Sequence, residues 1–267
     1  MANRLEGKSV VIIGGTGGIG ASAVRACIRE GACVVAVGLN SESADALCAE
    51  LSPKLRIIIA DATAPETAPE AICLCQKTFG RVHGLYHVAG GSGRRFGDGP
   101  LHELTDAGWS QTLNLNLTSV FLSNRAIIRY YLDLGIDGAV LNCGSILGSS
   151  PSPHFFATHA YATAKSALIG LTTAAAAHYA PYNIRFNLLA PGLIATPMSQ
   201  RAQDNKAIQS FIHSKQPLDG GRIGLPTDLD NAVLWLLSDE SLFVTGQVIA
   251  IDGGWSVSEG QITKSPQ

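Results

Sequence analysis

Short apolar runs rich in β-branched residues alternate along the chain with longer segments of helical periodicity. Most of the short runs are apolar at every position, as expected for parallel strands that are covered on both faces. The alternation predicts an α/β fold, a doubly wound parallel sheet of Rossmann type with about seven strands and helices on both faces. The predicted strands are residues 10–13, 33–37, 57–60, 84–88, 139–143, 184–189 and 247–251. The predicted helices are residues 21–30, 43–51, 65–79, 108–134, 158–179 and 227–238.

The chain has no internal repeat, no low-complexity segment and no Pro/Ser-rich linker, so residues 1–267 are predicted to form a single domain. Two segments, near 91–104 and 196–224, show no regular pattern and follow predicted strands. Ligands of doubly wound sheets bind beyond the carboxyl ends of the strands, so both segments are candidate substrate loops. A C-terminal tail is expected from about residue 256.

Charged residues make up 15% of the chain, whereas about 25% is usual in globular proteins. The formal net charge of −2 argues against nucleic-acid binding, which needs a basic stripe. The shortage of charge is concentrated, because Lys165 is the one charged side chain in residues 138–184. Prolines and many polar residues interrupt this stretch, so no membrane span is predicted. A lone lysine in apolar surroundings needs a reason, because burying an ammonium is costly.

The six cysteines include no C-x-x-C pair. Cys73 and Cys75 are closer together than the usual zinc spacing, so no metal site is predicted and both are expected to be small buried apolar residues. No secretory signal is predicted, because Arg4, Glu6 and Lys8 interrupt the N-terminal segment. These features predict a reduced, cytoplasmic protein.

A glycine-rich string, GGTGGIG, occupies residues 14–20 between the first predicted strand and an Ala-rich helix. Glycine allows a tight strand-to-helix turn, and it lets a phosphate approach the amides at the helix N-terminus. The string therefore predicts dinucleotide binding. The other interpretation is a turn that only permits close packing of the helix. The string fits G-x-G-x-x-G on Gly15, Gly17 and Gly20, and G-x-x-x-G-x-G on Gly14, Gly18 and Gly20.

The acidic residue that usually binds the adenosine ribose of NAD is missing, since Gly38 stands at the end of the second predicted strand. Gly17 and Leu39 provide no cation for the 2′-phosphate of NADP. NAD is therefore favoured over NADP, although Asn40 or Ser41 could hydrogen-bond to either cofactor.

Tyr161 and Lys165 are four residues apart in a predicted helix, so their side chains share a face. A nearby ammonium is expected to lower the pKa of the phenol, which would let Tyr161 exchange a proton with a ketone or an alcohol. Ser145 follows the strand that precedes this helix, and its hydroxyl could polarise a carbonyl oxygen. A solvated Tyr/Lys pair and a serine that serves only the turn are the structural alternatives.

With these motifs in place, the sequence resembles the short-chain dehydrogenase/reductase family from Lys8 to about Trp255. Tyr161 and Lys165 match the family's Y-x-x-x-K, and Ser145 matches its catalytic serine. Residues 116–121 look like the family's N-L-x-x-x-F helix, and residues 186–196 look like the segment that cradles the nicotinamide. The chain departs from the pattern in having Ile13 before the glycines and His87 in the Asn-Asn-Ala-Gly motif.

The resemblance implies that the protein is an NAD(P)-dependent oxidoreductase that interconverts a ketone or aldehyde with an alcohol. It implies that the catalytic residues are Asn116, Ser145, Tyr161 and Lys165, and that Asn116 supports a proton-relay water. It also implies that the protein forms a homotetramer or, less often, a homodimer. The cofactor-binding residues that it implies are Gly14, Thr16, Gly18, Ile19, Gly20, Leu39, Asp61, Ala62, Ala89, Gly90, Tyr161, Lys165, Pro191, Gly192, Ile194 and Thr196.

The substrate is a small carbonyl or alcohol compound whose identity the sequence leaves open. Arg94 and Arg95 in the first candidate loop could bind a carboxylate or phosphate, and His159 could line the pocket; solvent or subunit contacts are the alternatives. A dinucleotide-sensing regulator without catalysis is one alternative function. A serine hydrolase is another, which the absence of a G-x-S-x-G motif around Ser145 disfavours.

Overall fold

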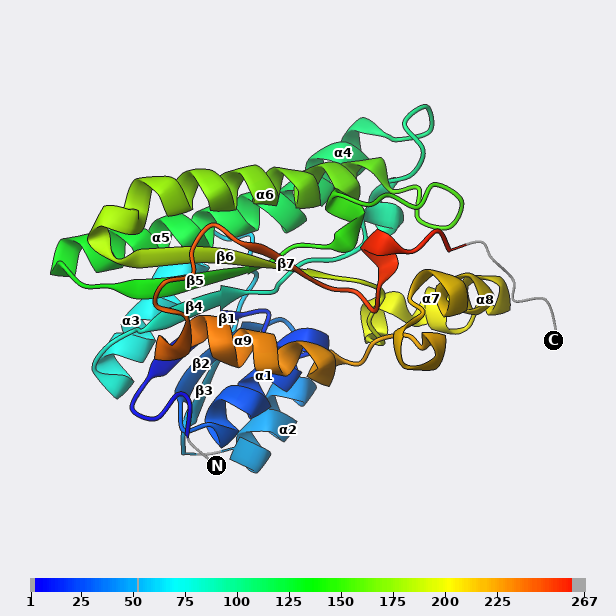
Figure 1. Cartoon of the computed structure of the whole chain (residues 1–267). Coiled ribbons are helices and arrows are strands. Elements are labelled where there is room, and N and C mark those ends of the chain that lie inside the picture. Colours follow the sequence, from blue (N-terminus) through cyan, green and yellow to red (C-terminus); the bar gives the residue numbers. More distant parts are fainter. Residues whose placement is uncertain (1–2, 52, 261–267) are drawn as a thin grey trace.

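The computed structural model describes residues 3–51 and 53–260. Its centre is a parallel seven-stranded sheet with the strand order β3-β2-β1-β4-β5-β6-β7 (Figure 1). The predicted α/β, doubly wound fold is thereby confirmed. The strands are β1 (Ser9–Ile13), β2 (Cys33–Gly38), β3 (Leu55–Ile59), β4 (Gly84–His87), β5 (Gly138–Cys143), β6 (Ile184–Pro191) and β7 (Val248–Ile251).

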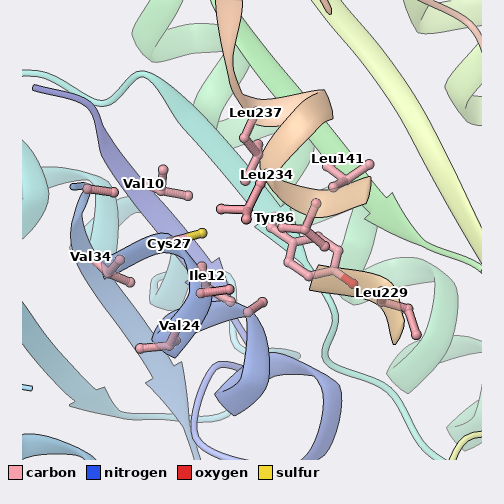
Figure 2. Packing of buried hydrophobic residues seen from close by; sticks show 14 of the residues in the cluster. Val10, Ile12, Val24, Cys27, Val34, Tyr86, Leu141, Leu229, Leu234 and Leu237 are labelled. Carbon is pink, nitrogen blue, oxygen red and sulfur yellow. The ribbon is translucent and has the colours of Figure 1, made fainter. Parts of the chain in front are cut away.

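Helices cover both faces of this sheet (Figure 1). One face carries α1 (Gly18–Arg29), α2 (Ser41–Leu51) and α9 (Asp230–Leu237), and the other carries α3 (Thr67–Phe79), α5 (Ser119–Leu134) and α6 (His159–Tyr179). In the interior strands, alternate side chains enter two separate cores, so continuous apolar runs are needed there. Figure 2 shows the first core, where Tyr86 lies among Leu141, Leu229 and Leu234.

The strand order reverses at β1, which pairs with β2 on one side and with β4 on the other. The connections after β1 and β4 therefore diverge and leave a crevice beyond the carboxyl ends of these strands. The segments that follow β4 and β6 also extend to this edge, where α4 (Asp106–Leu113), α7 (Gln200–Gln203) and α8 (Lys206–Lys215) lie. The topology thus determines where a ligand site can form.

Three predictions of local structure are wrong in detail. Residues 196–224 are not irregular, because they contain α7 and α8; the side chain of Asn205 caps α8, and Ile208 and Ile212 are buried one turn apart on it. The predicted helix 108–134 is interrupted by a π turn at Asn114–Thr118. Cys73 is exposed although Cys75 is buried, because residues two apart on a helix point in different directions.

The predicted tail lies partly outside the described residues, since its last seven positions are 261–267. Its described part is held against α8. The hydroxyl of Ser258 donates to the carbonyl of Lys215 at 2.7 Å, and the hydroxyl of Ser214 donates to the carbonyl of Gly260 at 2.7 Å. Among the described helices, none has the length and apolar character to cross a membrane.

Candidate active site

A cleft of about 460 Å³ opens at the carboxyl edge of the sheet, where the strand order reverses. Of the residues that the family resemblance assigns to the cofactor, only Thr16 is not among those that line the cleft. Ser145 and Arg94 line it too, whereas Asn116, Arg95 and His159 do not. The cleft also includes residues that the sequence analysis did not single out, among them Leu115 and Trp255, and Ser92, Met198 and Arg201 from the two candidate loops.

The glycine loop is shaped for close backbone contact. Gly14 has φ +92°, and a Cβ on it would lie 2.5 Å from the amide nitrogen of Ala89. A Cβ on Gly20 would lie 2.0 Å from the carbonyl oxygen of Gly14. No larger residue fits at either position, and the amides of the first turn of α1 stay open toward the cleft. Such a helix N-terminus suits the pyrophosphate of a dinucleotide.

At the end of the cleft beside β2, Gly38 stands where an acidic residue would bind the ribose of a dinucleotide. A Cβ on Gly38 would lie 1.8 Å from the hydroxyl oxygen of Thr16, so Thr16 fills the space that an aspartate would need. Leu39 beside it is 71% exposed. Asp61 lines the cleft further along, and its carboxylate accepts hydrogen bonds from the amide and the hydroxyl of Thr63 at 2.8 and 2.9 Å.

Tyr161, Lys165 and Ser145 all line the opposite end of the cleft. The ammonium of Lys165 is buried, lies 5.6 Å from the centre of the Tyr161 ring and donates a hydrogen bond to the carbonyl of Cys143 at 2.9 Å. Ser145 begins a 3-10 turn at the end of β5, and its hydroxyl accepts a hydrogen bond from the amide of Leu147. Strand and helix thus bring three residues from two segments to one place.

The pKa of the Tyr161 phenol differs from the expected value. Burial raises it to about 12, and the hydroxyl of Ser145 opposes this shift. The expected lowering by Lys165 is not found, because desolvation outweighs any effect of the ammonium; burial also lowers the pKa of Lys165 itself. In this structure Tyr161 is therefore protonated near neutral pH, and it is suited to donate a proton.

Asn116 lies in the π turn between α4 and α5 and is fully buried. Its side-chain amide donates to the carbonyls of Gly91 and Thr112, and its side-chain oxygen accepts from the amide of Gly91, each at 3.0 Å. Single π turns inside helices are frequently found at functional sites. A Cβ on Gly90 would lie 2.8 Å from the side-chain oxygen of Asn116 and 3.4 Å from the ammonium of Lys165, so the absence of a side chain at Gly90 leaves room for both groups.

A further residue, Asp98, determines the position of the helix that carries Tyr161. Its two carboxylate oxygens accept hydrogen bonds from the amides of Ala160 and Tyr161, each at 3.0 Å. Asp98 is buried, and it belongs to the segment that follows β4. Sequence reasoning missed it, because nothing in a linear pattern links position 98 to a helix that begins at 159.

The segment after β6 is held by Gln216, which is buried. The side-chain oxygen of Gln216 accepts from the amide of Leu193 at 2.6 Å, and its side-chain nitrogen donates to the carbonyl of Leu193 at 3.3 Å. These bonds hold Pro191, Gly192 and Ile194 against the cleft.

Comparison with known proteins identifies the family to which a chain with these features belongs. The sequence profile of a family described as "Enoyl-(Acyl carrier protein) reductase" matches residues 14–256. A solved structure, a short-chain type dehydrogenase/reductase from Mycobacterium ulcerans, superposes with a TM-score of 0.87 at 28% identity, covering 97% of this chain and 92% of the other. The chain belongs to the short-chain dehydrogenase/reductase family.

Curated relatives of this family member include two dehydrogenases. The 2,5-dichloro-2,5-cyclohexadiene-1,4-diol dehydrogenase of Sphingobium indicum is 33% identical, with 94% of this chain and 98% of the relative covered. The 3-alpha-(or 20-beta)-hydroxysteroid dehydrogenase of Mycobacterium bovis is 34% identical, with 95% and 91% covered. This short-chain dehydrogenase/reductase is accordingly an NAD(P)-dependent oxidoreductase that interconverts alcohols and carbonyl compounds. The comparisons lend no support to a regulator or a serine hydrolase.

His87 is the main departure from the family's pattern within the core. It is fully buried at the end of β4, and its Nδ1 lies 2.7 Å from the hydroxyl of Ser123. Burial, followed by the charge of Lys165, lowers the pKa of His87 to about 3. The imidazole is therefore neutral in this short-chain dehydrogenase/reductase at any pH near neutrality.

Proposed function

We propose that Tyr161 is the general acid and base of this oxidoreductase. In the reducing direction the phenol gives its proton to the carbonyl oxygen, and Ser145 hydrogen-bonds to the same oxygen and polarises it. The observation that supports these roles is the placement of Tyr161, Ser145 and Lys165 along one end of a cleft whose other end is the glycine loop.

The cleft residues fit a nicotinamide dinucleotide, which when bound supplies or accepts the hydride at the carbonyl carbon. Lys165 would bind the nicotinamide ribose and supply positive charge beside the phenol. Asn116 would support a water that returns the proton to Tyr161. The glycine loop would bind the pyrophosphate, and Asp61 would bind the adenosine.

We favour NAD as the cofactor over NADP. The described residues near the ribose position are Gly17, Gly38 and Leu39, with Asp61 beyond them, and none of them is a cation. A 2′-phosphate carries nearly two negative charges and would have no guanidinium or ammonium to bind there.

A panel of ketones and alcohols, followed with NADH and NADPH in parallel, tests this function. Tyr161→Phe is expected to abolish turnover, because the proton donor is lost, while binding of the reduced cofactor persists. Turnover within tenfold of the wild type would refute the role of Tyr161. Cofactor binding without turnover of any carbonyl would favour the regulator instead.

We also propose that the protein assembles as a homotetramer. Between His159 and His178 at its two ends, the exposed face of α6 consists of small uncharged residues such as Ser166, Gly170 and Ala174. At the β7 edge, Leu242 and Phe243 are exposed as well. One self-complementary face yields a dimer, whereas two separate faces yield a tetramer with twofold symmetry. Light scattering should report four subunits for the wild type and two for Phe243→Asp; a dimeric wild type would overturn the tetramer.

The cytoplasm is the compartment we infer. All six cysteines are free, including the exposed Cys73, which an oxidising compartment would leave open to pairing. Fractionation of cells that express the tagged protein tests this localisation.

A further inference from the structure

Two arginines from different segments meet at the substrate end of the cleft. Arg94 belongs to the 3-10 turn Gly93–Phe96 after β4, and Arg201 belongs to α7 after β6. Both line the cleft. Both guanidinium groups donate to one acceptor, the carbonyl oxygen of Phe155, at 3.3 Å from Arg94 and 3.2 Å from Arg201. The two cations are therefore held close to each other.

No carboxylate neutralises this pair within the described part of the chain. Arg4, Arg25, Arg81 and Arg222 each form an ion pair of 2.6–2.9 Å, whereas neither Arg94 nor Arg201 has one within 4.0 Å. Among the described residues that line the cleft, Asp61 is the one carboxylate, and it lies at the adenosine end.

Asp98, the acidic group whose charge acts on Arg94, is already occupied. Its two oxygens accept the amides of Ala160 and Tyr161. The pKa of Arg94 is lowered, first by burial and then by the charge of Arg201, and Asp98 opposes this only in part. An anion placed between the two guanidinium groups would relieve their repulsion and accept several charge-assisted hydrogen bonds.

Apolar side chains line much of the rest of the substrate end, beside Ser92, Thr158 and Ser199. Trp255 is buried and packs edge to face against Phe156 at 5.7 Å and against Phe211 at 5.7 Å between ring centres. The guanidinium of Arg201 lies 6.0 Å from the centre of the Phe156 ring. Met198 and Leu115 line the same cleft. An aromatic wall beside a pair of cations fits a molecule with an apolar body and one anionic end.

We infer that Arg94 and Arg201 form an anion subsite, and that the substrate is a carbonyl or alcohol compound with an apolar body and an oxyanion group. The oxyanion is a carboxylate, sulfonate or phosphate, since all three accept parallel N–H bonds from a guanidinium. This inference rests on the proposed function of the cleft, because it assigns the substrate of that same site.

Arg95 provides a matched control. It is the neighbour of Arg94 in sequence and carries the same charge, but it does not line the cleft, and its guanidinium stacks on Phe96 at 4.5 Å. A general effect of positive charge on the surface would involve Arg95 as much as Arg94. An effect of the subsite would involve Arg94 and not Arg95.

The test compares reduction of 4-acetylbenzoate, 4-acetylbenzenesulfonate and 4-acetylphenyl phosphate with that of the neutral methyl 4-acetylbenzoate. Wild type, Arg94→Gln, Arg201→Gln and Arg95→Gln are assayed with each compound. The wild type should prefer at least one anion over the ester by about tenfold or more in kcat/KM. Arg94→Gln and Arg201→Gln should each remove most of this preference for the anion over the ester, whereas Arg95→Gln should keep it. The anion that shows the largest preference identifies the oxyanion.

Equal kcat/KM for all the anions and the ester in the wild type would overturn the subsite, as would an equal loss in Arg95→Gln. Turnover of the ester would show in either case that the oxidoreductase function stands. If no compound is reduced, titration of the three anions into the enzyme with oxidised cofactor gives a second readout. Binding that Arg94→Gln weakens about tenfold would support the subsite independently of catalysis, and no binding of any anion would refute it.

Discussion

The carboxylate of Asp98 accepts the backbone amide of Tyr161 at 3.0 Å, and its other oxygen accepts the amide of Ala160 at the same distance. Asp98 is remote in sequence from the helix that it caps. It gives a fixed acceptor to the first turn of α6, where free amides would otherwise be buried. The position of the Tyr161 side chain therefore depends on a residue that follows β4.

Asp98→Ala should lower both stability and turnover. Loss of the cap should reduce the free energy of unfolding by about 1–2 kcal/mol, and the displaced Tyr161 should reduce kcat by about tenfold or more. Asp98→Asn keeps one acceptor oxygen, so it should retain part of the stability and part of the turnover that Asp98→Ala loses. Urea unfolding and steady-state kinetics measure the two effects.

Thr105→Ala is the control for Asp98→Ala. The hydroxyl of Thr105 caps α4 by accepting the amide of Gly108 at 2.9 Å, and α4 carries no proposed catalytic residue. This variant should lose comparable stability and keep kcat. A similar fall of kcat in both variants would show that Asp98 acts only through general stability.

The pH dependence of alcohol oxidation should change in Ser145→Ala. Oxidation needs the deprotonated Tyr161, whose pKa burial raises to about 12 while Ser145 opposes the rise. The rate in the wild type should therefore increase with pH through the alkaline range, and reduction, which uses the protonated phenol, should not. Without the serine the pKa rises further, so the rising limb of kcat/KM for oxidation should move to higher pH. An unmoved limb would contradict the contact between Ser145 and Tyr161.

Cofactor preference should respond to Gly38→Asp only when Thr16 is also changed. A Cβ at position 38 would lie 1.8 Å from the hydroxyl oxygen of Thr16, so Gly38→Asp alone should weaken both NADH and NADPH. Thr16→Gly/Gly38→Asp opens that space and should raise the preference for NADH by about tenfold. Fluorescence titration of both cofactors gives the ratio, and Thr16→Gly alone serves as the control. Tight NADH binding by the single variant would show that Thr16 does not block the site.

His87 should make the protein sensitive to acid. Its pKa is about 3 in the folded protein and 6.5 ordinarily. Between pH 6.5 and pH 3 the unfolded chain binds a proton on His87 that the folded protein does not bind. The stabilising effect of the neutral imidazole is therefore complete above about pH 6.5 and is lost as the pH falls toward 3. The loss should approach about 1.4 kcal/mol per pH unit.

His87→Asn should flatten this part of the profile of unfolding free energy against pH, measured in urea from neutral pH down to about pH 4.5. His102→Gln is the matched control, because the His102 side chain is 80% exposed. Profiles of His87→Asn and the wild type that run parallel would show that His87 is not the group responsible.

Local patterns predict much of this molecule. The glycine loop and the pair of Tyr161 and Lys165 are short-range motifs, and the strands are recognisable because both of their faces are buried. Asp98 and Arg201 could not be predicted, since each acts through a contact with a segment distant in sequence. The helix α8 was missed because only Ile208 and Ile212 form its buried stripe. The pKa of Tyr161 was predicted in the wrong direction, because charge spacing is visible in a sequence and desolvation is not.

The segment after β4 carries Arg94 and Asp98 four residues apart, one directed to the cleft and one to the catalytic helix. Exchanging such segments between relatives is a common way to redirect an enzyme to a new substrate. In this protein a whole-segment exchange would also remove the cap of α6 and disturb the chemistry that it was meant to preserve. A graft that keeps Asp98 and its neighbours, and varies only the positions around Arg94, separates recognition from catalysis.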